Sequence, residues 1–419
     1  MMKLVFPVCC GVDVHKNSIA ATIVSTQNTG ISTYIQETFS TQNYDIERFH
    51  QWLIKNQCYH VCMESTGKYW IPIFNYLESD INVCLTHPKY VKAIKGKKTD
   101  KKDSKWIADL FKFDLVRNSF IPPKDIRALR EIARYRFKLV CMKASEKNRI
   151  QNCMTVSNIG IASILSYPFG VTATQIIDYL LTSDTVDEKE CRKLIKGKAK
   201  DKSDAIIASI QGFNIESDQA MKMNLAKNHM TYLHQMICET EIELFVRSNH
   251  HRNIVVLMTE SPGITELSAT LILAEIGADM SVFESAKHMV SWAGLSPANN
   301  ESANKKKSVK ISKAGQYLKP LLVQCALAAI KSKKQPYFSY KYQNIKKRRG
   351  HKKAIIAIAR MMLVCIYHMI SNGEHFSPCD YEELLNPHPK EKNVTLTVES
   401  ALAFIASQGI DISSLMIPT

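Results

Sequence analysis

The chain has 419 residues, which is more than one hydrophobic core usually spans, so we expect two or three domains. Hydrophobic residues make up 45% and charged residues 22% of the chain, which excludes the disordered and fibrous classes. The 55 Lys and Arg outweigh the 39 Asp and Glu and give a net charge of +16, which favours a polyanionic partner, nucleic acid before a membrane surface.

The sequence predicts neither a membrane span nor a secreted protein. No stretch approaches the roughly 18–20 uninterrupted apolar residues of a spanning helix. The apolar opening MMKLVFPVCCGV runs directly into Asp13, His15 and Lys16, so we interpret it as a buried strand and not as a signal peptide. The 12 cysteines are scattered without a CxxC pair, which favours reduced thiols in cores and a cytoplasmic protein.

The first 120 residues alternate between β-rich runs and amphipathic helical runs. The predicted order is three strands, a helix, a strand, a helix, a strand and a helix, over residues 4–14, 19–25, 31–39, 44–56, 59–64, 69–79 and 82–87 and from about Asp103 onward. This order is that of a ribonuclease-H-like α/β domain. In such a sheet the first and fourth strands are neighbours.

Residues 125–250 are predicted to be mainly helical. Within 216–248, apolar residues follow a 3-4 spacing, which indicates a short coiled coil or a helix packed in a bundle. The positions are Met223, Ala226, Met230, Leu233, Ile237 and Leu244. An intramolecular bundle helix and a dimer seam remain equally good interpretations of this pattern.

Residues 255–300 consist of apolar helical runs joined by turns at Pro262-Gly263 and Gly277. Short helices joined by Gly turns can present backbone N–H groups to phosphate, as a helix-hairpin-helix unit does. Helices that pack through such turns without any ligand would have nearly the same sequence.

Positive charge is concentrated in residues 305–360, which hold 17 Lys or Arg and no Asp or Glu. Aromatic residues alternate with these cations in QPYFSYKYQNIKKRRGHKK, so both phosphate contacts and stacking on bases or sugars are chemically available. The alternative is a solvated charged surface. The predicted nucleic-acid-binding residues are Lys305, Lys306, Lys307, Lys346, Lys347, Arg348 and Arg349.

Four carboxylates stand at the ends of predicted elements. Asp13 ends the first strand in GVDVHK, Glu64 ends a later strand in MESTGKYW, and Asp100 and Asp103 lie where a helix begins in KTDKKDSKWIADL. Magnesium prefers a few carboxylate oxygens plus substrate phosphate, so converging acids would form a metal site. Because lysines surround Asp100 and Asp103, these two could instead be ordinary surface counter-charges.

Together with ITELSATLILAEIG and WAGLSPANNESANKKKSVKISKAGQYLKPLLVQCALAA, these motifs resemble the DEDD transposases of bacterial insertion sequences. In that family an element-encoded bridge RNA guides recombination. The resemblance covers roughly residues 5–120 and 255–372, and the joint order of the motifs is far more specific than any one of them.

The resemblance implies an N-terminal RuvC-like domain, a helical linker with a coiled coil and a helical transposase domain. On this basis we expect domains at 1–124, 125–250 and 251–375, followed by a small appendage at 376–419. It also implies a cytoplasmic recombinase that works as a homo-oligomer, a dimer or a tetramer, on DNA, with a guide RNA and Mg²⁺ or Mn²⁺.

By motif match, Asp13, Glu64, Asp100 and Asp103 are the expected metal ligands, and Ser302 is the expected nucleophile. The family usually has glycine after this serine, whereas Ala303 and Asn304 stand here, so Ser308 and Ser312 remain alternatives. A serine ester with the DNA keeps the bond energy for rejoining. Without the resemblance, a serine at this position would be interpreted as a turn residue.

Two other functions compete with a recombinase. A junction or single-strand nuclease would use the four acids alone and would hydrolyse instead of rejoining, and it would not need the serine. A non-catalytic nucleic-acid-binding protein would need neither the four acids nor the serine, so the presence of all four acids argues against it.

Overall fold

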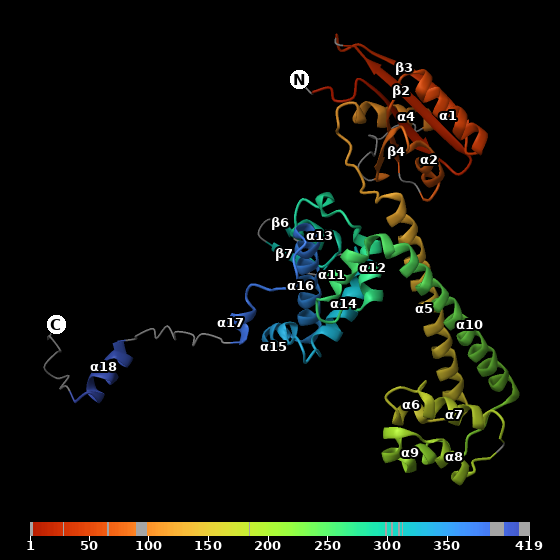
Figure 1. Ribbon diagram of the computed structural model, residues 1–419, viewed down its shortest axis with the longest axis vertical. Helices are drawn as coiled ribbons and strands as arrows, with labels where there is room; N and C mark the ends of the chain where they lie inside the picture. Colours follow the sequence, from red (N-terminus) through yellow and green to blue (C-terminus); the bar gives the residue numbers. More distant parts are fainter. Residues whose placement is uncertain are drawn as a thin grey trace. The chain divides into compact units, whose positions relative to one another are not determined.

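The computed structural model describes residues 3–27, 29–64, 67–88, 99–183, 185–297, 300–302, 305–308, 311, 313–385 and 398–409 (Figure 1). The chain forms two compact units, Met1–Glu131 and Ile132–Thr419. The division falls inside the long helix α5 (Lys124–Val156), which begins in the first unit and continues in the second.

A five-stranded sheet forms the centre of the first unit, in the order β3-β2-β1-β4-β5. The strands are β1 (Val8–Val14), β2 (Ser18–Thr26), β3 (Ser32–Ser40), β4 (His60–Glu64) and β5 (Asn82–Thr86). The β1–β2 and β2–β3 pairs are antiparallel, whereas the β1–β4 and β4–β5 pairs are parallel. The predicted order of elements is confirmed, and the first and fourth strands are neighbours.

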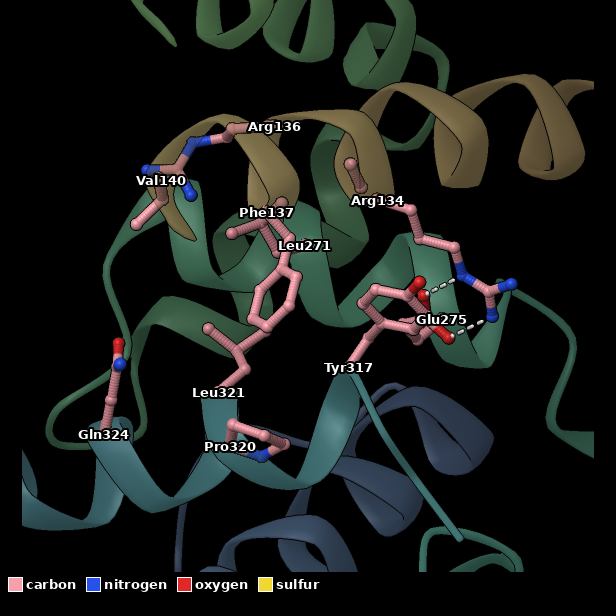
Figure 2. A pocket seen from close by; sticks show the side chains of 11 residues that line it. Arg134, Arg136, Phe137, Val140, Leu271, Glu275, Tyr317, Pro320, Leu321 and Gln324 are labelled. Atoms are coloured by element: carbon pink, nitrogen blue, oxygen red, sulfur yellow. Dashed lines mark hydrogen bonds and ion pairs between the residues drawn. The ribbon is translucent and has the colours of Figure 1, made fainter. Parts of the chain in front are cut away.

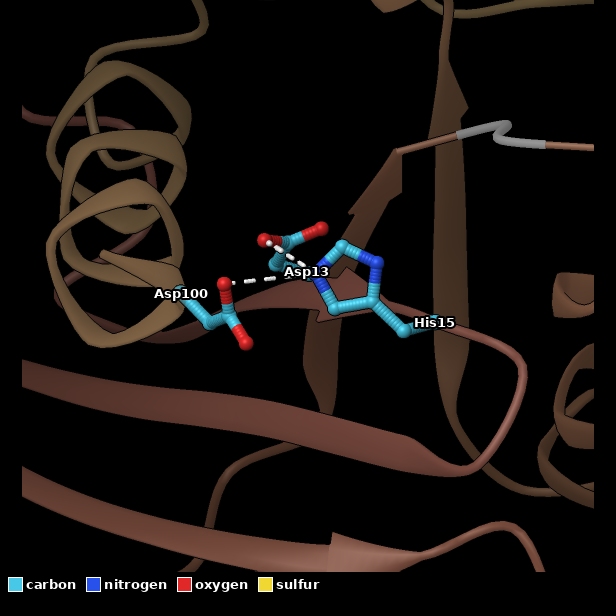
Figure 3. Close-up of side chains that lie close together, drawn as sticks. All are labelled: Asp13, His15 and Asp100. Atoms are coloured by element: carbon cyan, nitrogen blue, oxygen red, sulfur yellow. Dashed lines mark ion pairs between the residues drawn. The ribbon is translucent and has the colours of Figure 1, made fainter. Parts of the chain in front are cut away.

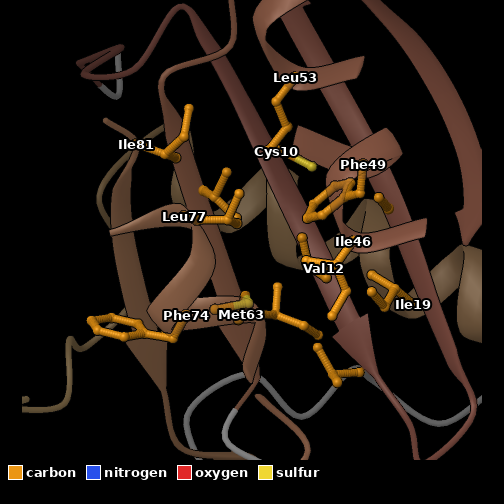
Figure 4. Close-up of a cluster of buried hydrophobic side chains, with 14 of the residues drawn as sticks. Cys10, Val12, Ile19, Ile46, Phe49, Leu53, Met63, Phe74, Leu77 and Ile81 are labelled. Carbon is orange, nitrogen blue, oxygen red and sulfur yellow. The ribbon is translucent and has the colours of Figure 1, made fainter. Parts of the chain in front are cut away.

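Helices cover both faces of this sheet. Helices α1 (Asn43–Lys55) and α2 (Trp70–Leu77) supply Phe49 and Leu77 to a buried cluster that includes Val12 and Met63 of the sheet (Figure 4). On the other face, α4 (Asp100–Phe111) buries Ile107, Ala108 and Phe111 against side chains of β1, β2, β4 and β5. Alternate residues of each strand therefore point into different cores, as the two-residue period of a strand requires.

Helix α4 lies unusually close to β1 because Gly11 has no side chain. A Cβ built at Gly11 would lie 2.2 Å from the carbonyl oxygen of Ser104 and 2.3 Å from the amide nitrogen of Ala108. The Ser104 hydroxyl also forms a 2.7 Å hydrogen bond with the hydroxyl of Thr22 on β2, and this bond is buried. The first turns of α4 are thereby fixed against the sheet, and the helix begins at Asp100, slightly earlier than predicted.

The second unit is almost entirely helical. Its helices are α6 (Ile161–Ile164), α7 (Val171–Leu180), α8 (Glu188–Leu194), α9 (Ser203–Ala208), α10 (Ser217–Ser248), α11 (Arg252–Thr259), α12 (Glu266–Ile276), α13 (Ala286–Trp292), α14 (Leu318–Ala329), α15 (Tyr337–Arg349), α16 (His351–Asn372), α17 (Tyr381–Leu385) and α18 (Val398–Ser407). Three short 3-10 helices, at Gly197–Lys202, Asn249–His251 and Met280–Val282, complete it together with a small hairpin of β6 (Asn300–Ser302) and β7 (Lys305–Ser308).

Helix α10 packs along α5 within the second unit (Figure 1). Leu233 and Ile237 cluster with Leu139 of α5, and Met223 and Ala226 lie in a larger core that includes Met154 of α5. The seam that the sequence predicted is therefore buried within one chain, which decides between the two interpretations in favour of intramolecular packing.

Helix α16 is the central helix of the C-terminal part. It is long and apolar enough to cross a membrane by length and composition alone, which the sequence analysis did not predict because its apolar residues are not uninterrupted. Eight of its residues are nevertheless buried, including Ile358, Met362 and Ile366, and it packs against α11, α13, α14 and α15. These contacts are those of a core helix.

Candidate functional site

Asp13 is a buried carboxylate at the end of β1, with only 6% of its surface exposed. Cys10, Val12 and Val14 point into the core under α1 and α2, so Asp13 points to the other face, toward α4. The pKa of its carboxyl is raised to about 6, chiefly by burial and also by the charges of Glu64, Asp100 and Asp103, although His15 acts to lower it. The four predicted acids thus lie within electrostatic reach of one another.

Glu64 reaches this site from the neighbouring parallel strand. Val12 pairs with Met63, so Asp13 and Glu64 are the next residues of β1 and β4. Met63 lies in the core under α1 and α2, and Cys62 lies in the core under α4, so Glu64 must share the α4 face with Asp13. Parallel strands end at the same edge of a sheet, which is why residues 51 positions apart in the sequence meet there.

Asp100 and Asp103 come from the first turn of α4. The hydroxyl of Thr99 accepts a hydrogen bond from the backbone N–H of Lys102 and caps this helix. Acids in a first turn are stabilised by the helix dipole, so these two carboxylates would be favourable even without a ligand. Their position beside Asp13 nevertheless distinguishes them from scattered surface counter-charges.

His15 is a component of this site that the sequence prediction missed (Figure 3). Its Nε2 lies 3.4 Å from Oδ2 of Asp13 and 3.4 Å from Oδ1 of Asp100. The available signal was the spacing in GVDVHK, because residues two apart on a strand point to the same side. The imidazole of His15 therefore lies between one carboxylate of β1 and one of α4.

The donor set fits a divalent cation. One ligand atom from each of Asp13, His15 and Asp100 lies within 4.8 Å of the others, and Asp13 is buried. Hard carboxylate oxygens suit Mg²⁺ and Mn²⁺, and an imidazole nitrogen is compatible with Mn²⁺. Repulsion among four neighbouring acids, which raises the pKa of Asp13, is what a bound cation would relieve.

Ser302 lies at the end of β6, which pairs with β7 in a small antiparallel hairpin. Its backbone is the register partner of Lys305, the first residue of β7, and Ser308 at the other end of the hairpin pairs with Asn300. Ser312, Ala303 and Asn304 lie outside the described residues. Lys305, Lys306 and Lys307 all belong to β7, so the hairpin carries the candidate serine and three lysines together.

The second basic group ends α15. Lys346, Lys347, Arg348 and Arg349 are all exposed in the last turn of this helix, where cations also complement the helix dipole. Gly350, with a φ of 76°, separates them from Lys352 and Lys353 at the start of α16.

The expectation that the aromatic residues of this segment are available for stacking is wrong for most of them. Tyr337, Phe338 and Tyr342 are buried, and the hydroxyl of Tyr337 donates to Asp380 at 2.9 Å. Of the tyrosines and phenylalanines between residues 337 and 342, only Tyr340 is exposed. These rings form part of a core because α15 places every third or fourth residue on its buried face.

A cavity of about 110 Å³ lies in the second unit between α5, α12 and α14 (Figure 2). Arg134 forms two 2.9 Å hydrogen bonds to the buried carboxylate of Glu275, and its guanidinium lies 4.6 Å from the ring centre of Tyr317. Leu271 and Leu321 supply much of the apolar lining. Since Arg134 is already paired, these contacts connect three helices and offer no free charge to a substrate.

Comparison with known proteins agrees with this arrangement. Residues 10–159 match the DEDD transposase profile of the IS110 type, and residues 256–343 match the profile of the transposase IS116/IS110/IS902 family. The first match contains all four acids, and the second contains Ser302 and both halves of the hairpin. The chain therefore belongs to the IS110 family of transposases.

A curated relative supports the same family. The chain is 29% identical over 156 residues to the insertion element IS900 uncharacterized 42 kDa protein of Mycobacterium paratuberculosis. This alignment covers 37% of the chain and 38% of the relative, so the chain spans about two fifths of the relative's length.

Proposed function

We propose that this protein is the transposase of an insertion sequence and that it cuts and rejoins DNA. The observation that carries the proposal is the convergence of Glu64, Asp100 and Asp103 on Asp13 at one edge of the sheet. Asp13 itself is buried, and its ionised form is destabilised there. Stability alone does not favour a buried Asp13 beside three further acids, because burial and like charges raise the free energy of its ionised form. Membership of a transposase family supports the same reaction.

The proposed fold of the first unit is the ribonuclease-H-like, or RuvC-like, fold. Three antiparallel strands extended by two parallel ones, with helices on both faces, support this assignment. In the second unit, α11, the Ser261–Gly263 turn and α12 are the proposed helix-hairpin-helix. Gly263 has a φ of 82°, and its position against the backbones of Cys325 and Ala329 leaves no room for a side chain.

We assign Mg²⁺ or Mn²⁺ to the four acids, with His15 beside them. A divalent ion there would stabilise charge on the attacked phosphate and on the attacking and leaving oxygens. Asp13 and Glu64 would hold it from the sheet, and Asp100 and Asp103 from α4. Gly11 and the Thr22–Ser104 hydrogen bond keep α4 close enough to the sheet for these two groups to meet.

Ser302 is the proposed nucleophile for strand exchange. Its Oγ forms a bond to phosphorus while the bond to a deoxyribose oxygen breaks, and that oxygen takes up a proton and leaves as a hydroxyl. A hydroxyl of a second strand then attacks the serine ester, and Oγ leaves with its proton restored. Cations on the neighbouring β7 favour the charge that develops on the phosphate.

DNA is the proposed partner of the basic hairpin and of the exposed end of α15, because phosphates attract such groups without regard to sequence. A guide RNA and assembly of several copies follow from the resemblance to bridge-RNA-guided elements. Structured RNA encoded beside the gene, co-purifying with the protein, would support the RNA partner.

The test is to trap the serine ester. Full-length protein incubated with Mg²⁺ and nicked element-end DNA should yield DNA covalently attached to a tryptic peptide that contains Ser302. Ser302→Ala should remove both the adduct and strand transfer while leaving metal binding unchanged, and Ser291→Ala, on α13, is the matched control. An adduct on Ser308 or Ser312 would support the same serine mechanism and would identify that serine, instead of Ser302, as the nucleophile.

Strand transfer by Ser302→Ala, with no adduct in 302–312, would exclude the serine mechanism. Metal-dependent cleavage without strand transfer or adduct, in the wild type and in Ser302→Ala alike, would identify a hydrolytic nuclease. Nucleic-acid binding without cleavage in any metal would identify the non-catalytic alternative.

A further inference from the structure

His15 is held beside the carboxylate site by the turn that joins β1 and β2. Its backbone N–H donates to the carbonyl oxygen of Ser18 at 2.9 Å, which closes this turn. The hydroxyl of Thr41 donates to the carbonyl oxygen of Lys16 at 2.8 Å and fixes the middle of the same turn. The imidazole therefore extends from a well-supported part of the sheet, as a preorganised ligand requires.

The imidazole of His15 lies too far from its two carboxylates for strong hydrogen bonds. A charge-assisted N–H···O bond is about 2.7–2.9 Å long. Nε2 of His15 instead lies 3.4 Å from Oδ2 of Asp13 and 3.4 Å from Oδ1 of Asp100. Other histidine–carboxylate pairs have the shorter length: 2.8 Å for His50 and Asp80, 2.9 Å for His229 and Glu146, and 2.7 Å for His375 and Glu260. The arrangement at His15 is thus not that of a simple ion pair.

The spacing at His15 is that of donor atoms around one metal ion. With metal–ligand bonds of about 2.1 Å, neighbouring donors stand about 3.0 Å apart at octahedral angles and about 3.4 Å apart at tetrahedral angles. One ligand atom from each of Asp13, His15 and Asp100 lies within 4.8 Å of the others (Figure 3). The three side chains can therefore contact one ion together with little movement.

This group of donors is closed on one side and open on the other. The side chain of Asp13 is 9% exposed, whereas those of His15 and Asp100 are 46% and 59% exposed. Three protein ligands with an open remaining position are typical of catalytic metal sites, because water or a substrate oxygen completes the coordination. The exposed side of this group leaves room for a phosphate oxygen.

The donor atoms distinguish between the two candidate ions. Mg²⁺ prefers oxygen ligands and gives up its water reluctantly. Imidazole nitrogen is a softer donor that suits first-row transition ions. Four acids alone would form an all-oxygen site suited to Mg²⁺, whereas the addition of one imidazole favours Mn²⁺.

We propose that His15 binds the divalent ion directly, together with Asp13 and Asp100, and that its imidazole makes the site prefer Mn²⁺ to Mg²⁺. The inference rests on the proposed metal site and adds a nitrogen ligand to it. His15 is thereby a determinant of metal specificity, and not only a neighbour of the acids.

The ligand can be tested with Mn²⁺ alone, because the unpaired electrons of this ion couple to a coordinated nitrogen. Pulsed electron paramagnetic resonance of the Mn²⁺-loaded full-length protein should show the coupling of a directly bound imidazole nitrogen. His15→Gln should remove that coupling. His87→Gln is the matched control and should retain it, because His87 is an exposed histidine that directly follows β5 in the same unit.

Metal affinity, measured by calorimetry, gives a second readout. His15→Gln should weaken Mn²⁺ binding about tenfold or more, since loss of a group that only orients a ligand already costs about 10–100-fold. Mg²⁺ binding should change little, because the carboxamide of Gln offers an oxygen in place of the nitrogen. A purely structural role of His15 would change both affinities alike. Far-UV circular dichroism and thermal melting establish that the variants are folded.

Asp13→Asn separates the role of His15 from the metal site itself. Mn²⁺ binding that Asp13→Asn weakens, but that shows no nitrogen coupling in the wild type, would overturn the role of His15 and leave the acids as the site. Mn²⁺ binding that Asp13→Asn leaves unchanged would overturn the metal site and the role of His15 together. Equal losses of Mn²⁺ and Mg²⁺ affinity in His15→Gln, or a nitrogen coupling that disappears only in His87→Gln, would also overturn the proposal.

Discussion

The two regions that carry candidate chemistry are built in different ways. The carboxylate site gathers side chains from β1, β4 and α4, which are far apart in the sequence, and buries one of them. The serine hairpin is local, because Ser302 and Lys305 to Lys307 lie within six residues on two neighbouring paired strands. The first region therefore depends on the packing of a whole unit, whereas the second depends on a short segment.

This difference indicates how each region should respond to mutation. Substitutions in the core of the first unit should displace α4, and with it the acids that α4 carries, even when the substituted residue contacts none of the acids. Changes around the hairpin and at the end of α15 should alter charge and reactivity without altering the stability of the fold, because surface substitutions have small effects on folding.

The largest expected effect comes from removing one acid. Glu64→Gln should lower DNA cleavage in Mg²⁺ by about 10³-fold or more, as loss of a central catalytic group does. DNA affinity should change little, because Glu64 repels phosphate and does not attract it. Glu37→Gln on β3 is the control, and it should cleave at the wild-type rate. Equal rates for the two variants in a gel-based cleavage assay would remove Glu64 from the site.

Gly11→Ala should impair the same site through the fold. The added methyl would lie 2.2 Å from the backbone of Ser104, so α4 must move away from β1 and carry Asp100 and Asp103 with it. Overpacking of this kind destabilises a protein by about 1–3 kcal/mol. Chemical denaturation would measure the loss, with cleavage and metal affinity measured in parallel. Gly170→Ala, whose nearest contact would be at 3.6 Å, should have a much smaller effect.

The pH dependence of stability reports on Asp13. In metal-free protein, burial raises the pKa of Asp13 from 3.8 to about 6 in the folded state, so the charged form destabilises the fold above pH 6. This penalty disappears as the pH falls from about 6 to 4. Asp13→Asn should therefore be more stable than wild type at pH 7–8, by about 1–3 kcal/mol, and should lose that advantage toward pH 4.

Added metal sharpens this prediction. Mg²⁺ or Mn²⁺ should raise the melting temperature of the wild type and leave that of Asp13→Asn nearly unchanged, because binding to the folded state alone stabilises it. An equal rise in both proteins would place the ion elsewhere, and an unchanged stability difference between pH 8 and pH 4 would contradict the raised pKa of Asp13.

The smallest expected effect concerns the basic end of α15. Replacing Lys346, Lys347, Arg348 and Arg349 by Ala should weaken DNA binding and flatten the slope of log K against log salt by up to about 0.9 per lost duplex contact, or about 0.7 for single strands. Stability should remain the same. Four exposed lysines of the second unit, Lys196, Lys198, Lys200 and Lys202, provide a control of equal charge. Identical slopes for the two quadruple variants would mean that the end of α15 only solvates the surface.

Local patterns in the sequence were sufficient for much of the first unit. The order of strands and helices follows from alternating and 3-4 spacings of apolar residues, and GVDVHK and MESTGKYW mark where strands end in acids. Each of these signals lies within a few residues of the chain, so it can be recognised from the sequence without knowledge of the fold. The positive charge of residues 305–360 is likewise a property of composition.

Partners far apart in the sequence were decided by the tertiary structure. Only the pairing of β1 with β4 brings Glu64 beside Asp13, and only the close approach of α4 at Gly11 brings Asp100 beside Asp13 and His15. Likewise, only packing determined that Tyr337 and Tyr342 are core residues, and which apolar face of α10 is covered by α5. The spacing of apolar residues shows that a face will be buried, but which surface buries it depends on where distant segments meet.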